Sequence, residues 1–130
     1  MENLRRIMIG DKTYPFKIDL NVLEHIQDEY GTINQFEREL LGLRFKKDEE
    51  GKQVYKDGEP AMFRTEPSIK AIKTVLPAAI NEGLAIEADV ENRSYEKVTA
   101  EFVIRECAIP YDILANMLHE EFRRCFQTKK

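Results

Sequence analysis

Apolar residues recur every three or four positions through most of this 130-residue chain, and this spacing restricts the fold more than any other feature. Such side chains share one face of a helix and form a stripe that must be buried. The clearest stripes lie in residues 20–30, 33–41, 69–88 and 110–127. A chain of this mass can bury roughly 68% of the surface that its unfolded form exposes. The pattern therefore predicts one domain, residues 1–130, built mainly from helices.

The beginning of the chain has a different period. Apolar side chains alternate with polar ones in residues 4–9 and 13–18, which is the two-residue repeat of a strand. Gly10 lies between the two stretches, in a segment typical of a turn. We therefore expect an N-terminal β-hairpin whose buried face carries Ile7, Ile9, Tyr14, Phe16 and Ile18.

Capping residues mark the first two helices. Asp19 precedes the first stripe and Gly31 follows it, which are favoured residues just before and just after a helix. Thr32 and Gly42 bracket the second stripe in the same way. These four residues predict helices over about 20–30 and 33–41.

Residues 43–64 are polar and strand-like. Residues 43–47 and 53–56 alternate about the polar turn 48–52, Asp57-Gly58 is a second turn signal, and residues 61–64 form a third short strand. Few apolar side chains occur here. We expect a second β-hairpin arm, inserted into the domain and exposed to solvent.

The second half of the chain predicts three more helices. Pro77 interrupts the longest stripe, so we expect a kink or break near residues 73–76. Because proline is tolerated in the first turn of a helix, a break would let residues 77–88 form their own helix. Thr99 begins a short helix, and Pro110 begins the last one. The predicted fold class is α+β and mainly helical, with the N-terminal hairpin, about five helices and the arm at residues 43–64.

The last helix carries a broad apolar stripe, which allows two interpretations. It can be a core helix, or part of it can receive a partner or a second copy of the chain, with methionine as an adaptable contact. The second interpretation names the candidate partner-binding residues Leu114, Met117, Leu118, Phe122 and Phe126.

The composition and the charge of the chain exclude several classes of function. Twenty basic and twenty-four acidic residues give a net charge of −4, spread evenly, which argues against a nucleic-acid partner. Apolar runs are too short for a membrane helix, and the N-terminus lacks a secretory signal, so we expect a cytoplasmic protein without a membrane partner. The two cysteines, Cys107 and Cys125, are then expected as free thiols.

The sequence lacks recognisable motifs for catalysis, metal binding or phosphate binding. His25 and His119 lie in charged helical segments, which favours solvated surface positions. His119 and Cys125 are six positions apart, which places them on different faces of a helix. Metal-binding motifs and glycine-rich phosphate loops do not occur. We expect no cofactor, no metal and no catalytic residue, and we favour a binding or structural protein over an enzyme.

Two stretches resemble a known family. They are YPFKIDLNVLEHIQDEYGTINQFERELLGL (Tyr14–Leu43) and IKAIKTVLPAAINEGLAIEADVENRSYEKVTAEFV (Ile69–Val103), the latter centred on INEGL at residues 80–84. Their order is similar to that of the tail assembly chaperones of long-tailed phages and prophages of Gram-positive bacteria. The stretch 44–64 lies outside the part of the chain that carries this resemblance.

The resemblance implies a small, mainly helical, non-enzymatic protein in the cytoplasm of a bacterial host. Proteins of this family bind the tape measure protein, keep that long helical chain in solution and help tail-tube subunits to polymerise around it. The implied partners are the tape measure protein and the tail tube protein. Self-association of copies of the chain is expected separately, from the apolar stripe of the last helix.

Two other functions stay open at this stage. The first is another phage structural component, such as a head–tail connector or a tail-completion subunit. The second is a DNA-binding regulator, because residues 20–30 and 33–41 superficially suggest a helix-turn-helix. The second of these helices presents Glu37, Arg38 and Glu39, which is a poor face for DNA.

Overall fold

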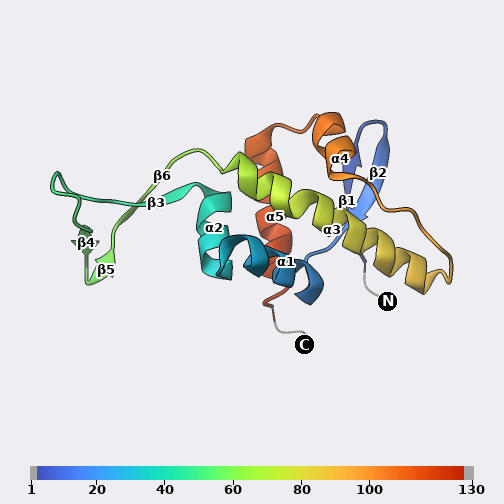
Figure 1. Cartoon of the computed structure of the whole chain (residues 1–130), viewed down its shortest axis with the longest axis horizontal. Coiled ribbons are helices and arrows are strands. Elements are labelled where there is room, and N and C mark those ends of the chain that lie inside the picture. The colour runs from blue at the N-terminus through green and yellow to red at the C-terminus, as the bar shows by residue number, and fades with distance from the viewer. Residues whose placement is uncertain (1–2, 128–130) are drawn as a thin grey trace.

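The computed structural model describes residues 3–127, and it confirms a mainly helical α+β fold (Figure 1). The N-terminal hairpin, five helices and the arm at residues 43–64 are all present in that part of the chain. The elements in chain order are β1 (Arg5–Ile9), β2 (Lys12–Phe16), α1 (Leu20–Tyr30), α2 (Ile33–Leu41), β3 (Leu43–Phe45), β4 (Tyr55–Lys56), β5 (Glu59–Pro60), β6 (Met62–Arg64), α3 (Ile69–Val90), α4 (Ala100–Glu106) and α5 (Tyr111–Arg124).

Helix α3 organises the body of the molecule. It contacts β2, α1, α2, α4 and α5, and Figure 1 shows it running between the hairpin and the helices α1 and α2. Its side chains Val75, Leu76 and Ile80 are fully buried. The hairpin, α1, α2 and α5 bury their apolar faces in the same cluster, which makes one core.

Strand β2 approaches α3 so closely that only glycine fits at the contact. A methyl group on Gly83 would lie 2.5 Å from the carbonyl oxygen of Pro15 and 2.8 Å from the backbone nitrogen of Phe16. Four residues earlier in α3, the carbonyl oxygen of Ala79 accepts a hydrogen bond of 3.0 Å from the backbone N–H of Lys17. The end of the hairpin is thus attached to the helix backbone.

The expected break of α3 at Pro77 does not occur. The helix is continuous from Ile69 to Val90, with Pro77 buried inside it. Proline removes one backbone hydrogen bond, to the carbonyl of Lys73. Leu76, just before Pro77, and Ala79, two residues after it, are fully buried. Burial of the apolar face before and after Pro77 therefore offsets the lost hydrogen bond. A separate helix over 77–88 does not form.

The predicted caps of the first two helices are confirmed. The Asp19 carboxylate accepts hydrogen bonds from the backbone N–H groups of Asn21 and Val22, and the Thr32 hydroxyl accepts one from Gln35. Gly31 and Gly42 follow α1 and α2 with positive φ angles of 79° and 73°. The last helix is shorter than expected and ends at Arg124 instead of residue 127.

The arm is confirmed, but its strands pair differently from the expectation. Strand β3 pairs with β6, the strand that leads back to the body, and β4 pairs with β5 around the Asp57-Gly58 turn. The expected pairing of residues 43–47 with 53–56 is reduced to one bridge between Lys47 and Gln53. The arm therefore has a two-stranded stem that divides into two short turns (Figure 1).

The start of the arm is fixed to α2 by contacts at Gly42. The backbone N–H and the hydroxyl of Thr65 both donate to the Gly42 carbonyl oxygen, at 2.6 and 2.9 Å. Arg44 donates to the Glu39 carboxylate at 3.3 Å, and the Arg38 guanidinium lies 4.9 Å from the centre of the Phe45 ring. The contacts between Gly42 and Thr65 hold the two ends of the arm together, which places β3 beside β6.

We expect Gly83→Ala to destabilise the fold. Helix propensity alone would stabilise this variant by about 1 kcal/mol, but the added methyl group meets the β2 backbone, and overpacking of this kind costs about 1–3 kcal/mol. Thermal unfolding should show a lower midpoint for Gly83→Ala. The control Ala85→Gly, at a half-exposed site of the same helix, should lose only about 1 kcal/mol. A more stable Gly83→Ala protein would contradict the close approach.

Stability should also depend on the protonation of Glu82. Its carboxyl shares a hydrogen bond with Asp19, and this contact, together with burial, raises the pKa of Glu82 above the ordinary 4.5. The folded protein then binds this proton more tightly than the unfolded chain, so the stabilisation is complete below pH 4.5 and is lost as the pH rises through the raised pKa.

The variant Glu82→Gln tests this dependence. Glutamine keeps an acceptor for the Asn21 side-chain amide, now 3.0 Å from Glu82, and donates permanently to Asp19. We expect its unfolding midpoint to exceed that of the wild type at pH 7, with the gain shrinking towards pH 4. The exposed control Glu96→Gln should give no such trend. A constant difference across this pH range would refute the shared proton.

Candidate functional site

The structure separates the five candidate partner-binding residues into two environments. Leu114, Leu118 and Phe122 are only 5%, 0% and 2% exposed, and Met117 is half-buried against the same core. Phe126 is 58% exposed. The five residues therefore do not form one accessible surface, because the stripe of α5 faces α2 and α3 and serves as the core helix of the first interpretation.

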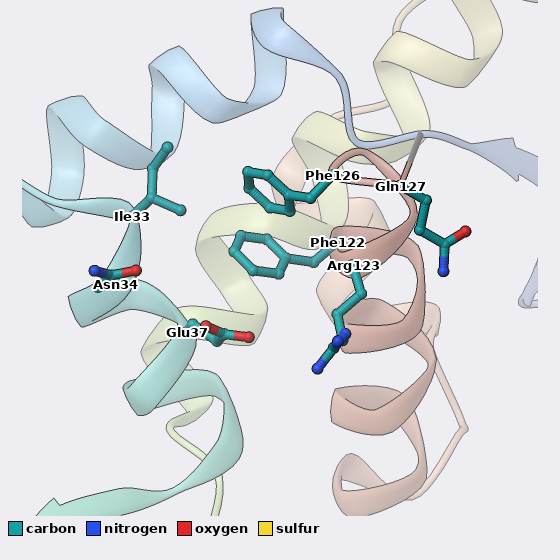
Figure 2. A pocket seen from close by; sticks show the side chains of 7 residues that line it. All are labelled: Ile33, Asn34, Glu37, Phe122, Arg123, Phe126 and Gln127. Atoms are coloured by element: carbon teal, nitrogen blue, oxygen red, sulfur yellow. The ribbon is translucent and has the colours of Figure 1, made fainter. Parts of the chain in front are cut away.

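An open groove lies where the end of α5 passes α2. Its volume is about 530 Å³, and Figure 2 shows the side chains of both elements pointing into it. Two of the five candidate residues, Phe122 and Phe126, belong to this groove. It is lined by Ile33, Asn34, Glu37, Phe122, Arg123, Phe126 and Gln127.

Aromatic side chains make the apolar wall of the groove. The Phe122 ring lies 5.7 Å from the Phe36 ring, which is fully buried, and 5.2 Å from the Phe126 ring, centre to centre. The first contact anchors Phe122 to α2 in the core, and the second holds the exposed Phe126 against it. This wall therefore has a fixed base and an accessible edge.

A polar contact between α2 and α5 supports the opposite wall. The Nε2 atom of His119 lies 2.8 Å from a carboxylate oxygen of Glu37, and the His119 ring stacks on Phe122 at 6.0 Å. His119 is half-buried, so the expectation of a solvated surface position holds for His25 but is wrong for His119. The sequence could not reveal this contact, because its partners are far apart in the chain.

The rim of the groove carries both signs of charge. Glu37 and Arg123 come from opposite sides, and Asn34 and Gln127 add uncharged donors and acceptors (Figure 2). A surface of this kind suits an amphipathic partner, whose apolar side chains meet the phenylalanines while its polar groups meet the rim.

The thiol beside the groove is not arranged as a nucleophile. Burial raises the pKa of Cys125, and its Sγ atom donates a hydrogen bond of 2.9 Å to the backbone oxygen of Phe122. A raised pKa keeps the thiol protonated at neutral pH, which lowers its reactivity. His119 is occupied by Glu37, and the two cysteines, Cys107 and Cys125, are not joined to each other.

One carboxylate of α5 is buried close to the groove. Glu121 is 0% exposed and accepts a hydrogen bond of 2.8 Å from Arg124 through one oxygen. Its other oxygen has no hydrogen-bond partner among residues 3–127. The ion pair lies within one helix, at i and i+3, and it compensates one buried charge at the C-terminal end of α5.

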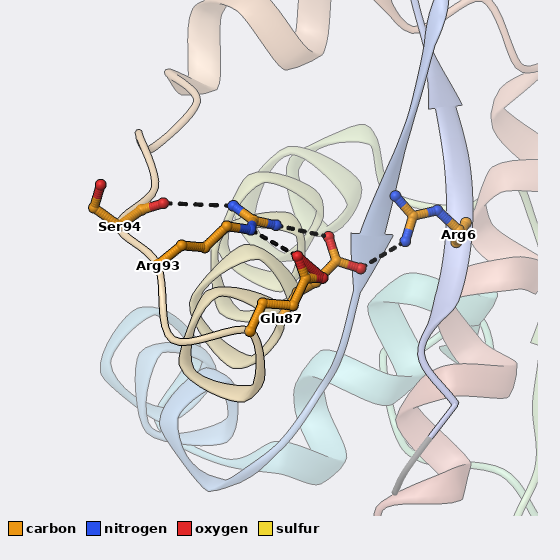
Figure 3. Close-up of polar contacts among 5 residues, drawn as sticks. Arg6, Glu87, Arg93 and Ser94 are labelled. Atoms are coloured by element: carbon orange, nitrogen blue, oxygen red, sulfur yellow. Dashed lines mark hydrogen bonds and ion pairs between the residues drawn. The ribbon is translucent and has the colours of Figure 1, made fainter.

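Another charged cluster ties the polar loop after α3 to the hairpin. The Glu87 carboxylate forms ion pairs with two arginines (Figure 3). Its Oε2 atom lies 2.8 Å from Nη1 of Arg6, and its Oε1 atom lies 3.5 Å from Nη2 of Arg93. Arg93 also donates to the backbone oxygen of Ser94 at 3.4 Å. Both oxygens of Glu87 are used within the chain, so this cluster holds the strand and loop against α3.

The described residues contain neither a metal-binding cluster nor a helix suited to cross a membrane. In residues 3–127, no three histidine, cysteine, aspartate or glutamate side chains lie close enough together to hold a metal ion. None of the helices in this range combines the length and apolar character that a membrane span requires. Comparisons with protein-family models, with curated proteins and with solved structures each gave no match.

Charged substitutions should separate the buried from the exposed part of the α5 stripe. Leu118→Glu places an unpaired carboxylate in the core, which we expect to destabilise the protein by more than about 4 kcal/mol and to abolish cooperative unfolding. Phe126→Glu changes an exposed side chain and should cost about 1 kcal/mol or less. Circular dichroism melts measure both; a stably folded Leu118→Glu protein would mean that α5 does not pack as described.

Proposed function

We propose that this protein is a tail assembly chaperone of a phage or prophage, and that it binds an apolar helical segment of the tape measure protein in the α2–α5 groove. The resemblance of Tyr14–Leu43 and Ile69–Val103 supports the family. The single structural observation that carries the proposal is the open groove whose aromatic wall ends in the exposed Phe126.

The groove is suited to hold a helix from another chain. Amphipathic helices bind in apolar grooves through side chains spaced three or four residues apart, and the charged rim fixes their orientation. Phe126 and Ile33 lie on the two sides of the groove, so an apolar side chain inserted between them would contact both elements. A tape measure chain, long and helical with apolar faces, presents many such side chains.

The proposed activity is non-covalent. The protein shelters apolar surface of its partner until tail-tube subunits assemble around it, without cofactor or metal, in the cytoplasm of the bacterial host. The tail tube protein is the second proposed partner. Neither nucleic acid nor a membrane takes part in this function.

Coexpression with the tape measure protein tests the proposal. We expect the wild-type protein to keep the tape measure protein in the supernatant and to copurify with it. Phe126→Glu and Ile33→Glu should reduce the copurified amount at least about tenfold, because a carboxylate enters the apolar wall. The control is Ile113→Glu on α5, which is 50% exposed outside the groove and should bind normally.

Two results would decide against this function. If folded Phe126→Glu and Ile33→Glu proteins still retain the tape measure protein, the groove is not the binding site. If the wild-type protein instead forms a stable ring of six or more copies in light scattering and ignores the tape measure protein, it is a different phage component, such as a connector or tail-completion subunit.

A further inference from the structure

The arm carries its charges in two separate regions. Residues 43–47 and 61–64, here called the stem, contain four basic side chains and no acidic one. Residues 48–60, here called the tips, contain five acidic and two basic side chains. Figure 1 shows the arm extending away from the helical body, with the stem next to α2 and the tips at the far end. The arm is therefore positive near the body and negative at its end.

The stem also exposes apolar side chains. Phe45, Met62 and Phe63 are 38%, 46% and 48% exposed, and all three lie on the paired strands β3 and β6. Each strand pairs with only one other strand in residues 3–127, so each has an open edge. A two-stranded ribbon with exposed aromatic side chains gains stability when another surface covers it.

Close contacts at the base of the stem fix the direction in which the arm leaves the helical body. At Gly42, with φ of 73°, an added methyl group would lie 2.5 Å from the Thr65 carbonyl oxygen, and the Thr65 N–H bonds to the Gly42 carbonyl at 2.6 Å. Arg44 is held by Glu39, so three basic side chains of the stem, Lys46, Lys47 and Arg64, stay available to another molecule. A fixed arm reduces the entropy lost when a partner binds.

We infer that the arm is a self-association element, and that it binds the arm of a second copy side by side in antiparallel orientation. In that arrangement the acidic tips of each copy lie against the basic stem of the other. A two-fold axis makes both contacts identical, as in most homodimers. Phe45, Met62 and Phe63 lie between Arg64 and Lys46 along each stem, so the tip of the other copy covers them.

A second copy fits this surface better than a polyanion does. The basic stem alone could attract nucleic acid, but a strand lying along the arm would pass the five acidic residues of the tips. Another arm supplies both the acidic complement for the stem and the basic complement for the tips. This inference concerns a surface distinct from the α2–α5 groove and does not depend on the proposed function.

Charge reversal in two sets of variants tests the inference. The tip variant is Glu49→Lys/Glu50→Lys/Glu59→Lys, which leaves Asp48 to accept its turn hydrogen bonds from Glu50 and Lys52. The stem variant is Lys46→Glu/Lys47→Glu/Arg64→Glu. The control, Glu24→Lys/Asp28→Lys/Glu29→Lys, makes the same change in net charge as the tip variant on the exposed face of α1.

Sedimentation equilibrium at low salt measures association. We expect a wild-type dimer whose dissociation constant rises at least about tenfold in the tip variant and in the stem variant, since each places like charges together. Mixing the two variants should restore a dimer of wild-type affinity, because each carries the charges that the other lacks. The α1 control should dimerise normally, and 1 M salt should weaken the wild-type dimer.

Four results would overturn the inference. They are a wild-type protein that stays monomeric at millimolar concentration, mixed variants that do not associate, an α1 control that is weakened as much as the tip variant, and a dimer lost in Phe126→Glu but kept in the stem variant. Binding of a fluorescent oligonucleotide that tightens in the tip variant would assign the stem to nucleic acid instead. Circular dichroism confirms that each variant is folded.

Discussion

The close contact between strand β2 and helix α3 determines the arrangement of this molecule. At Gly83 the two backbones approach to a distance that excludes even a methyl group, and the Ala79 carbonyl oxygen binds the chain just after the strand. This contact lets one short hairpin cover one face of the central helix, while α1, α2 and α5 cover others. Since α3 is the element that all of them share, its position sets theirs.

The groove forms where α2 and α5 pack against each other at the edge of the core. Phe36 on α2 and Phe122 on α5 meet in the interior, and their contact fixes the distance between the two helices. His119 and Glu37 add a polar link at the boundary between core and solvent. Beyond this link α5 ends, and Phe126 extends the aromatic contact out of the core. A groove built in this way is preorganised, because its base belongs to the buried cluster.

The groove and the arm expose side chains of different chemical character. The groove presents aromatic side chains with a mixed charged rim, whereas the arm presents a ribbon whose charges are sorted along its length. Gly42 connects the two regions, because it ends α2, which carries one wall of the groove, and begins the arm. The proposed partner site and the proposed self-association element are therefore separate, so occupation of one does not block the other.

Local sequence signals determined the secondary structure of this protein: the apolar periods gave the hairpin and helices, and residues such as Asp19 and Thr32 gave their first turns. Those signals act within a few residues, so they needed no tertiary context. Three features were decided only by the folded chain. Pro77 remains inside one helix because packing on both sides offsets its lost hydrogen bond. The stripe of α5 is core up to Phe122 and surface at Phe126 because α5 ends where α2 passes it. The arm pairs β3 with β6, since contacts with the body bring its two ends together, and contacts so distant in sequence leave no periodic signal.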